Sequence, residues 1–144
     1  MTAVLDTSRL AWTAVCHLAD LLPERGAAAL VQGEQVALVR LHGPDGGVGE
    51  SGAQESEPVV LAVQQLDPFS GAHVMSRGIV GTRGEVPTLA SPMYKQVFDL
   101  RTGVCLDRVG REPLAGHEAD LRTWPVRVEA GLVLVGSRPA EVAR

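Results

Sequence analysis

Short apolar runs separated by turn signals fill the sequence, and they constrain the fold more than any other feature. Examples are "AWTAVCHL", "QVALVRL", "VVLAVQQL" and "LVLVG", all of which include valine. Valine favours strands, and short runs of this kind at close spacing are typical of all-β proteins. We therefore predict an all-β fold in which short antiparallel strands form a sandwich or a partly open barrel.

Two hairpins can be identified from their turns. "AAALV" and "QVALVRL" are joined by "QGE", where Gly33 can adopt the positive φ that a tight turn requires. Near the C-terminus "VRVE" alternates apolar and polar residues before Gly131 and a second run, "LVLV". The only stretch that suggests a helical period is "PLAGHEADL", residues 113–121, and no internal repeat is visible.

The chain of 144 residues has the length of one domain, which we place at residues 11–136. We expect a flexible arm over residues 1–10 and a flexible tail over residues 137–144. Residues 42–58 are rich in Gly, Ser and Glu and can bury almost nothing, so they predict a flexible hairpin insertion within the domain. An acidic docking loop for a partner is the functional alternative for this segment.

Composition excludes several classes of function. The net charge is -4 and no Lys/Arg cluster is present, which argues against nucleic-acid binding. No apolar stretch approaches the ~20 residues that cross a bilayer, and the N-terminus lacks the pattern of a signal peptide, so we expect a cytoplasmic protein with no membrane partner. The two isolated cysteines, Cys16 and Cys105, are expected to be small buried thiols, although a disulfide stays open.

No catalytic or metal site is evident from residue spacing. No two of His17, His42, His73 and His117 are at the spacing of metal ligands, so each is expected to be structural or exposed. Ser91 could serve as a nucleophile, but no histidine partner can be assigned to it. The glycine-rich pattern of a dinucleotide site is also missing from the sequence.

Two loops, "LDPFSGAHVMSRG" and "ASPMYKQVFDLRTG", carry the strongest functional signal. With "SRG", "FDLRTG" and the closing hairpin in this order, the chain resembles Rieske iron–sulfur proteins over about residues 11 to 136. Those proteins hold a [2Fe–2S] cluster with two cysteines and two histidines, delivered by two such loops. When the loops are aligned on their prolines, the four ligand positions hold Asp67, Phe69, Ser91 and Tyr94.

The residues at these four positions argue against a cluster. Phenylalanine has no ligand atom and serine is a poor ligand for iron, while aspartate and tyrosine offer hard oxygens unsuited to a sulfide-bridged centre. Neither Cys16 nor Cys105 lies in the two loops. We therefore predict that this chain binds no cluster and no metal.

A Rieske-like scaffold with vacated ligand positions resembles the small subunit of assimilatory NAD(P)H-dependent nitrite reductase. The resemblance implies a Rieske-like β fold and a part in the reduction of nitrite to ammonium. It also implies a large-subunit partner that carries FAD, iron–sulfur centres and sirohaem, since such chemistry belongs to cofactors. We expect no cofactor and no catalytic site on this chain, which would support or position the large subunit or gate its electron path.

The resemblance also suggests where the partner binds, because the loop tips of a Rieske protein face its redox partner. Aromatic, Met and Arg residues are enriched in interfaces, and these loops supply a candidate set. The candidate interface consists of Phe69, Met75, Arg77, Met93 and Tyr94. The alternative is that Phe69 and Met93 fold inward and fill the space of a cluster.

Two further functions stay open at this point. A Rieske-type ferredoxin that passes electrons to an oxygenase would need the cluster. A stand-alone protein-binding module on the same scaffold would differ only in its partner.

Overall fold

A computed structural model describes residues 11–42 and 59–137 of the chain. The predicted arm, the predicted insertion beyond residue 42 and the predicted tail beyond residue 137 lie outside this part. Two short 3-10 helices span Leu18–Asp20 and Met75–Arg77. The strands are β1 (Trp12–His17), β2 (Arg25–Val31), β3 (Glu34–Leu41), β4 (Val59–Gln64), β5 (Ile79–Arg83), β6 (Val86–Ala90), β7 (Val97–Asp99), β8 (Cys105–Asp107), β9 (Thr123–Trp124), β10 (Val126–Glu129) and β11 (Leu132–Gly136).

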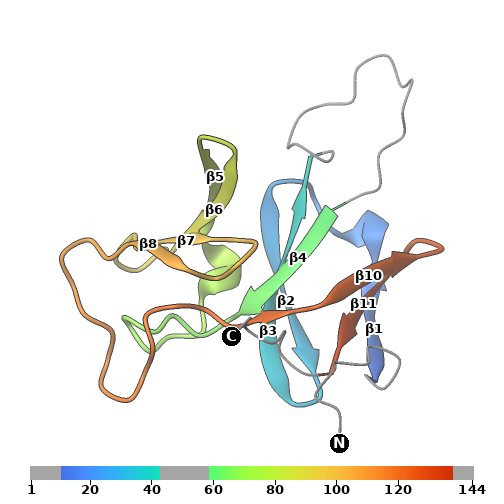
Figure 1. Ribbon diagram of the computed structural model, residues 1–144. Helices are drawn as coiled ribbons and strands as arrows, with labels where there is room; N and C mark the ends of the chain where they lie inside the picture. The colour runs from blue at the N-terminus through green and yellow to red at the C-terminus, as the bar shows by residue number, and fades with distance from the viewer. Residues whose placement is uncertain (1–10, 43–58, 138–144) are drawn as a thin grey trace, which may run out of the picture.

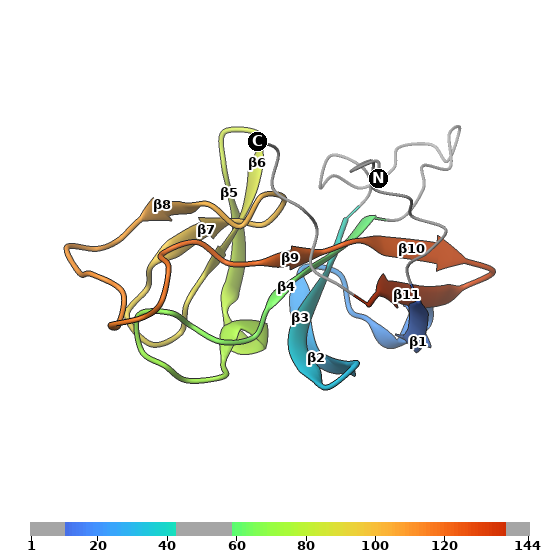
Figure 2. The ribbon, with the colours of Figure 1, turned by 60° about the horizontal axis from the view of Figure 1, so that its bottom comes forward.

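The strands form three antiparallel sheets, which confirms the predicted all-β class. The sheet orders are β1-β11-β10, β2-β3-β4-β9 and β5-β6-β7-β8. The sheet of β5 to β8 lies on one side of the molecule and the other two sheets lie on the other side (Figures 1 and 2). None of the three sheets closes into a barrel within the described residues.

The central strand β3 is buried on both of its faces. Val36 and Leu38 belong to one apolar cluster, together with residues of β11, while Ala37, Val39 and Leu41 belong to another, together with residues of β6 and β7. Alternate residues of a strand point to opposite faces, so a strand covered on both sides needs a continuous apolar run. The uninterrupted run "VALV" of β3 meets this requirement.

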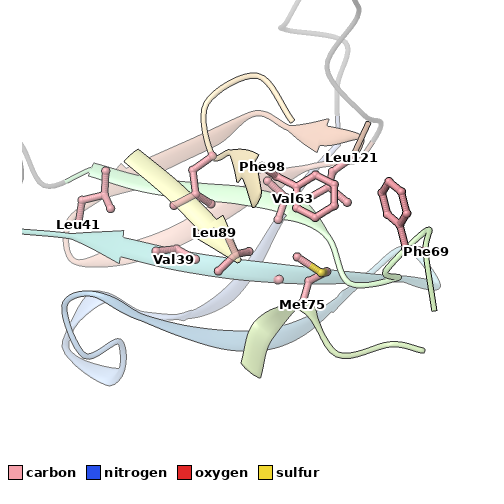
Figure 3. Packing of buried hydrophobic residues seen from close by; sticks show 10 residues of the cluster. Val39, Leu41, Val63, Phe69, Met75, Leu89, Phe98 and Leu121 are labelled. Carbon is pink, nitrogen blue, oxygen red and sulfur yellow. The ribbon is translucent and has the colours of Figure 1, made fainter. Parts of the chain in front are cut away.

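The apolar core between β3, β4 and the sheet of β5 to β8 lies directly beside the two loops that carry the four ligand positions. Side chains from these loops are part of it, as Figure 3 shows for Phe69 and Met75. Its buried members are Ala37, Val39, Leu41, Val63, Phe69, Met75, Leu89, Phe98, Leu100 and Leu121. The loops are therefore anchored by packing against the core as well as by hydrogen bonds.

Both predicted hairpins are present. Strands β2 and β3 are joined at Gln32 and Gly33, and β10 and β11 at Ala130 and Gly131, all four with positive φ as tight hairpin turns require. The suggested helix over residues 113–121 is wrong. This segment contains only turns, bends and irregular backbone, and Gly116 within it has φ +85, which a helix does not allow. Among the described residues no helix is long and apolar enough to cross a membrane.

Candidate functional site

The first vacated loop connects β4 to the 3-10 helix Met75–Arg77 and is organised by Asp67. One carboxylate oxygen, Oδ1, accepts a hydrogen bond from the Phe69 N–H at 2.9 Å, and Oδ2 accepts one from Ser70 Oγ at 2.9 Å. The Gly71 N–H also donates to the Asp67 carbonyl at 2.7 Å. A short acidic side chain that binds the backbone two residues on is typical of a tight turn.

The second vacated loop connects β6 to β7 and is closed around Ser91. The Ser91 N–H donates to the Gln96 carbonyl at 2.9 Å, and the Lys95 N–H donates to the Ser91 carbonyl at 3.1 Å. The hydroxyl of Ser91 accepts a further bond from the Met93 N–H at 3.1 Å. The serine therefore fixes the turn that carries the next three residues.

A direct hydrogen bond joins the two loops. Ser91 Oγ donates to Asp67 Oδ2 at 2.6 Å, and both residues are 0% exposed. We call this pair the Asp67–Ser91 clasp. A hydrogen bond to a carboxylate is short and about twice as strong as a neutral one, and burial protects it from water. The clasp therefore crosslinks the loops at two of the four positions that the resemblance assigns to cluster ligands.

The side chains at the other two ligand positions, Phe69 and Tyr94, point in different directions. Phe69 is buried and its ring centroid lies 6.2 Å from that of Phe98, in the core cluster (Figure 3). Tyr94 is exposed, and the Arg111 guanidinium lies 3.8 Å from the centre of its ring. The structure therefore brings together only Asp67 and Ser91 of the four predicted positions.

These residues do not fit a [2Fe–2S] cluster. Two thiolates and two imidazoles are needed, and the four positions supply a carboxylate, a hydroxyl, a phenol that points outward and a buried phenyl ring. Both oxygens of Asp67 are already engaged with three donors. In the described part of the chain, no group of three His, Cys, Asp or Glu is placed to hold a metal ion.

The predicted interface is only partly at the surface. Phe69 and Met75 are 4% and 0% exposed, so their assignment to a contact surface is wrong, because both side chains fill the core beside the loops. The alternative of inward packing holds for Phe69, whereas Met93 is exposed. Arg77 and Tyr94 are also exposed, and contact of these three with a partner stays a prediction.

A third segment, which the sequence analysis did not assign to the site, lies against both loops. It is the β8–β9 connection, whose Leu114 N–H donates to the Pro68 carbonyl of the first loop at 2.9 Å. The Gln96 amide of the second loop donates to the Arg108 carbonyl at 3.3 Å. In both views the β4–β5 and β8–β9 connections lie together at the end of the molecule away from β1 (Figures 1 and 2). The sequence did contain a signal for this segment: Val109 and Leu114 are isolated apolar residues in the glycine- and proline-containing run "RVGREPLAG".

The cysteines and the loop histidine play no part in this arrangement. Cys16 and Cys105 are free and half-buried, and burial is the main cause that raises the pKa of each thiol. His73 is exposed and pairs through its backbone with Leu66 at the base of the first loop. A free thiol with a raised pKa is a weak nucleophile at neutral pH.

The sequence of this chain is similar to those of known proteins. The sequence profile of the family described as Rieske-like [2Fe-2S] domain matches residues 11–136. The nitrite reductase (NADH) small subunit of Salmonella typhimurium is 31% identical over 122 residues, which cover 85% of this chain and 94% of that protein. The nitrite reductase [NAD(P)H] large subunit of Klebsiella oxytoca is 36% identical over 127 residues, or 88% of this chain, and the chain spans 11% of that protein's length.

The fold of this chain is also similar to those of solved structures. A crystal structure assigned to an NADH-dependent nitrite reductase small subunit from Mycobacterium tuberculosis is 39% identical, with a TM-score of 0.68 over 94% of this chain and 98% of that one. The ferredoxin of carbazole 1,9a-dioxygenase from Nocardioides aromaticivorans has a TM-score of 0.63 over 88% of this chain and 98% of that one. It is 20% identical, so it shows a shared fold.

Proposed function

The chain belongs to the Rieske-like [2Fe-2S] domain family, and on this premise we propose that it is the small subunit of an NAD(P)H-dependent nitrite reductase. The observation that carries the proposal is the similarity to the Salmonella small subunit over nearly the full length of that protein. The reaction assigned to the assembled enzyme is the reduction of nitrite to ammonium.

The proposed role of this chain is non-catalytic. Transfer of electrons from NAD(P)H to nitrite requires redox cofactors, and the proposal assigns FAD, iron–sulfur centres and sirohaem to the large subunit. The donor atoms at the vacated positions support this division, because the Asp67–Ser91 clasp engages two of those positions in hydrogen bonds. What remains for this chain is to bind the large subunit and to position it or gate its electron path.

The proposed partner is the large subunit, and the proposed location is the cytoplasm, where NAD(P)H is generated. The Klebsiella relative supports this partner, since a protein named as a large subunit contains a segment similar to 88% of this chain. A domain found both inside one chain and as a separate chain is expected to contact the same neighbour in either form.

Co-purification with the large subunit tests the assignment. The tagged chain is expressed with the large subunit of the same host, purified gently, and its visible spectrum is recorded beside that of the chain purified alone. We expect flavin and sirohaem absorption in the complex, and a colourless chain without iron or acid-labile sulfide. Stoichiometric iron and sulfide in the lone chain would instead support a Rieske-type ferredoxin.

Nitrite consumption tests the accessory role. NAD(P)H oxidation coupled to nitrite loss is measured for the large subunit alone, for this chain alone and for the two together. We expect no turnover by this chain alone and faster turnover by the pair than by the large subunit alone. A chain that neither binds the large subunit nor changes its rate would favour a stand-alone binding module.

A further inference from the structure

An exposed apolar patch lies on the outer side of the vacated loops. Met93, Tyr94, Val109 and Leu114 are 47%, 37%, 47% and 43% exposed. We call these four residues together with Arg111 the loop-tip patch. Scattered exposed apolar residues are ordinary, but several on segments that contact one another indicate an interaction surface.

The members of the loop-tip patch are held on a common framework. Arg111 lies over the Tyr94 ring at 3.8 Å and so ties the β8–β9 connection to the second loop. The backbone of Leu114 donates to Pro68 of the first loop at 2.9 Å. Pro68 is next to Asp67, whose clasp with Ser91 joins the first loop to the second. The patch is therefore built by two segments, the second loop and the β8–β9 connection, and both are held against the first loop.

Val109 is both strained and exposed. Its φ of +53° places a β-branched residue in the left-handed region, where such residues are rare. Val109 and Gly110, which has φ +72, form a tight turn that the Asp107 carboxylate caps by accepting the Val109 N–H at 2.8 Å. An exposed valine side chain contributes little to folding. Strain that does not benefit the fold is characteristic of functional sites, so this side chain is expected to have a binding role.

Two cations without a carboxylate partner in the described residues lie within the patch and next to it. Arg108 is paired with Glu112 at 2.7 Å, whereas Arg111 has no carboxylate partner among the ion pairs of the described residues. The ammonium of Lys95, next to Tyr94 in sequence, contacts only the Pro92 carbonyl at 3.4 Å within the same part of the chain. On a protein with net charge -4, this end combines apolar residues with uncompensated cations.

We propose that the loop-tip patch docks onto the large subunit, on an apolar face that presents a carboxylate to Arg111. The identity of this partner rests on the function proposed above. Charge complementarity favours an acidic group opposite Arg111, and arginine and aromatic residues are frequent anchors of interfaces. The patch differs from the interface expected from the sequence, because Phe69, Met75 and Arg77 are replaced by residues of the β8–β9 connection.

Val109→Gly separates docking from folding. Glycine adopts positive φ without strain, so the variant is expected to melt at the same temperature as the wild type or higher. Loss of the exposed side chain is expected to weaken binding to the large subunit by about tenfold, as measured by calorimetry. Arg111→Glu is expected to weaken binding by at least as much, with the largest loss at low ionic strength.

Leu22→Ser is the matched control. Leu22 is 59% exposed and lies beside Pro23. Pro23 pairs with Arg40 near the C-terminal end of β3, whereas Gln35 lies near the N-terminal end of that strand. Gln35 accepts a hydrogen bond from the Gln65 N–H, at the start of the first loop. The control thus removes an apolar side chain that is even more exposed than Val109, from the other end of the sheet. We expect it to bind the large subunit like the wild type.

The outcomes distinguish this inference from the function on which it rests. A wild-type chain that fails to bind the large subunit contradicts the proposed function and the docking surface together. Normal binding by the wild type, Val109→Gly and Arg111→Glu alike overturns the docking surface and leaves the proposed function intact. A lower melting temperature for Val109→Gly overturns the strain argument. Self-association of the wild type that Val109→Gly abolishes would identify a second copy as the occupant and also overturn the proposal.

Discussion

Replacement of Ser91 by alanine tests whether the Asp67–Ser91 clasp stabilises the fold. The substitution removes the 2.6 Å hydrogen bond to Asp67 Oδ2 and the acceptor of the Met93 N–H. A hydrogen bond to a charged group contributes about 1.5–3 kcal/mol to the free energy of unfolding. The Met93 N–H lies in an exposed residue where water can replace the lost acceptor, so we expect a loss of about 2 kcal/mol from the clasp alone.

Urea unfolding followed by circular dichroism measures this loss. We expect a lower midpoint at an unchanged m-value, since the surface exposed on unfolding is the same. Asp67→Ala should cost more, about 3–5 kcal/mol, because it leaves the Phe69 N–H and two hydroxyl groups without their acceptor.

Ser70→Ala provides the matched control for Ser91→Ala. Ser70 donates to the same carboxylate oxygen at 2.9 Å but is only partly buried, so water can take its place. We expect it to cost less than about 1 kcal/mol. If Ser91→Ala destabilises the protein no more than Ser70→Ala does, burial of the clasp does not strengthen it and the reasoning is refuted.

Three further predictions concern the surroundings of the loops. Phe69→Ala should lower the free energy of unfolding by about 3–5 kcal/mol in urea titrations, because Phe69 is a buried member of the core; a small loss would contradict its inward packing. Gly103→Ala should cost at least about 3 kcal/mol, since its Cβ would lie 2.0 Å from the Leu121 carbonyl oxygen. Gly116→Ala is its control, because it has similar positive φ but open space around it and should cost about 1–2 kcal/mol. Burial raises the pKa of Cys105, so less thiolate is present at neutral pH, and its alkylation by iodoacetamide should be slower there than that of a free thiol and should increase as the pH is raised. A rate equal to that of a free thiol at neutral pH would contradict this assignment.

The class of fold could be predicted from local sequence because strands and tight turns have local requirements. "QGE" and "EAG" lie at the turns of two hairpins, and each turn has its glycine at positive φ. The run "VALV" in β3 likewise carries its own signal of burial on both faces. Residues 113–121 do not form the suggested helix, since a helical spacing of apolar residues does not outweigh a glycine that adopts positive φ within the segment.

Part of the site was also accessible from sequence. Asp67, Phe69, Ser91 and Tyr94 were singled out by alignment of two loops on their prolines, and their chemistry argued against cluster binding without any coordinates. Their individual orientations could not be predicted in this way. Which side chains of a loop point inward depends on the space left by elements that are distant in sequence.

Residue type and order in this chain were thus sufficient to specify its strands, its tight turns and the chemistry missing from its loops, because these depend on side chains and their immediate neighbours. Three features depended on packing between distant segments: the bond from Ser91 to Asp67, the inward position of Phe69 and the assembly of the loop-tip patch. Each brings together residues separated by many positions along the chain. Their contact follows from the arrangement of whole sheets, which no local pattern encodes.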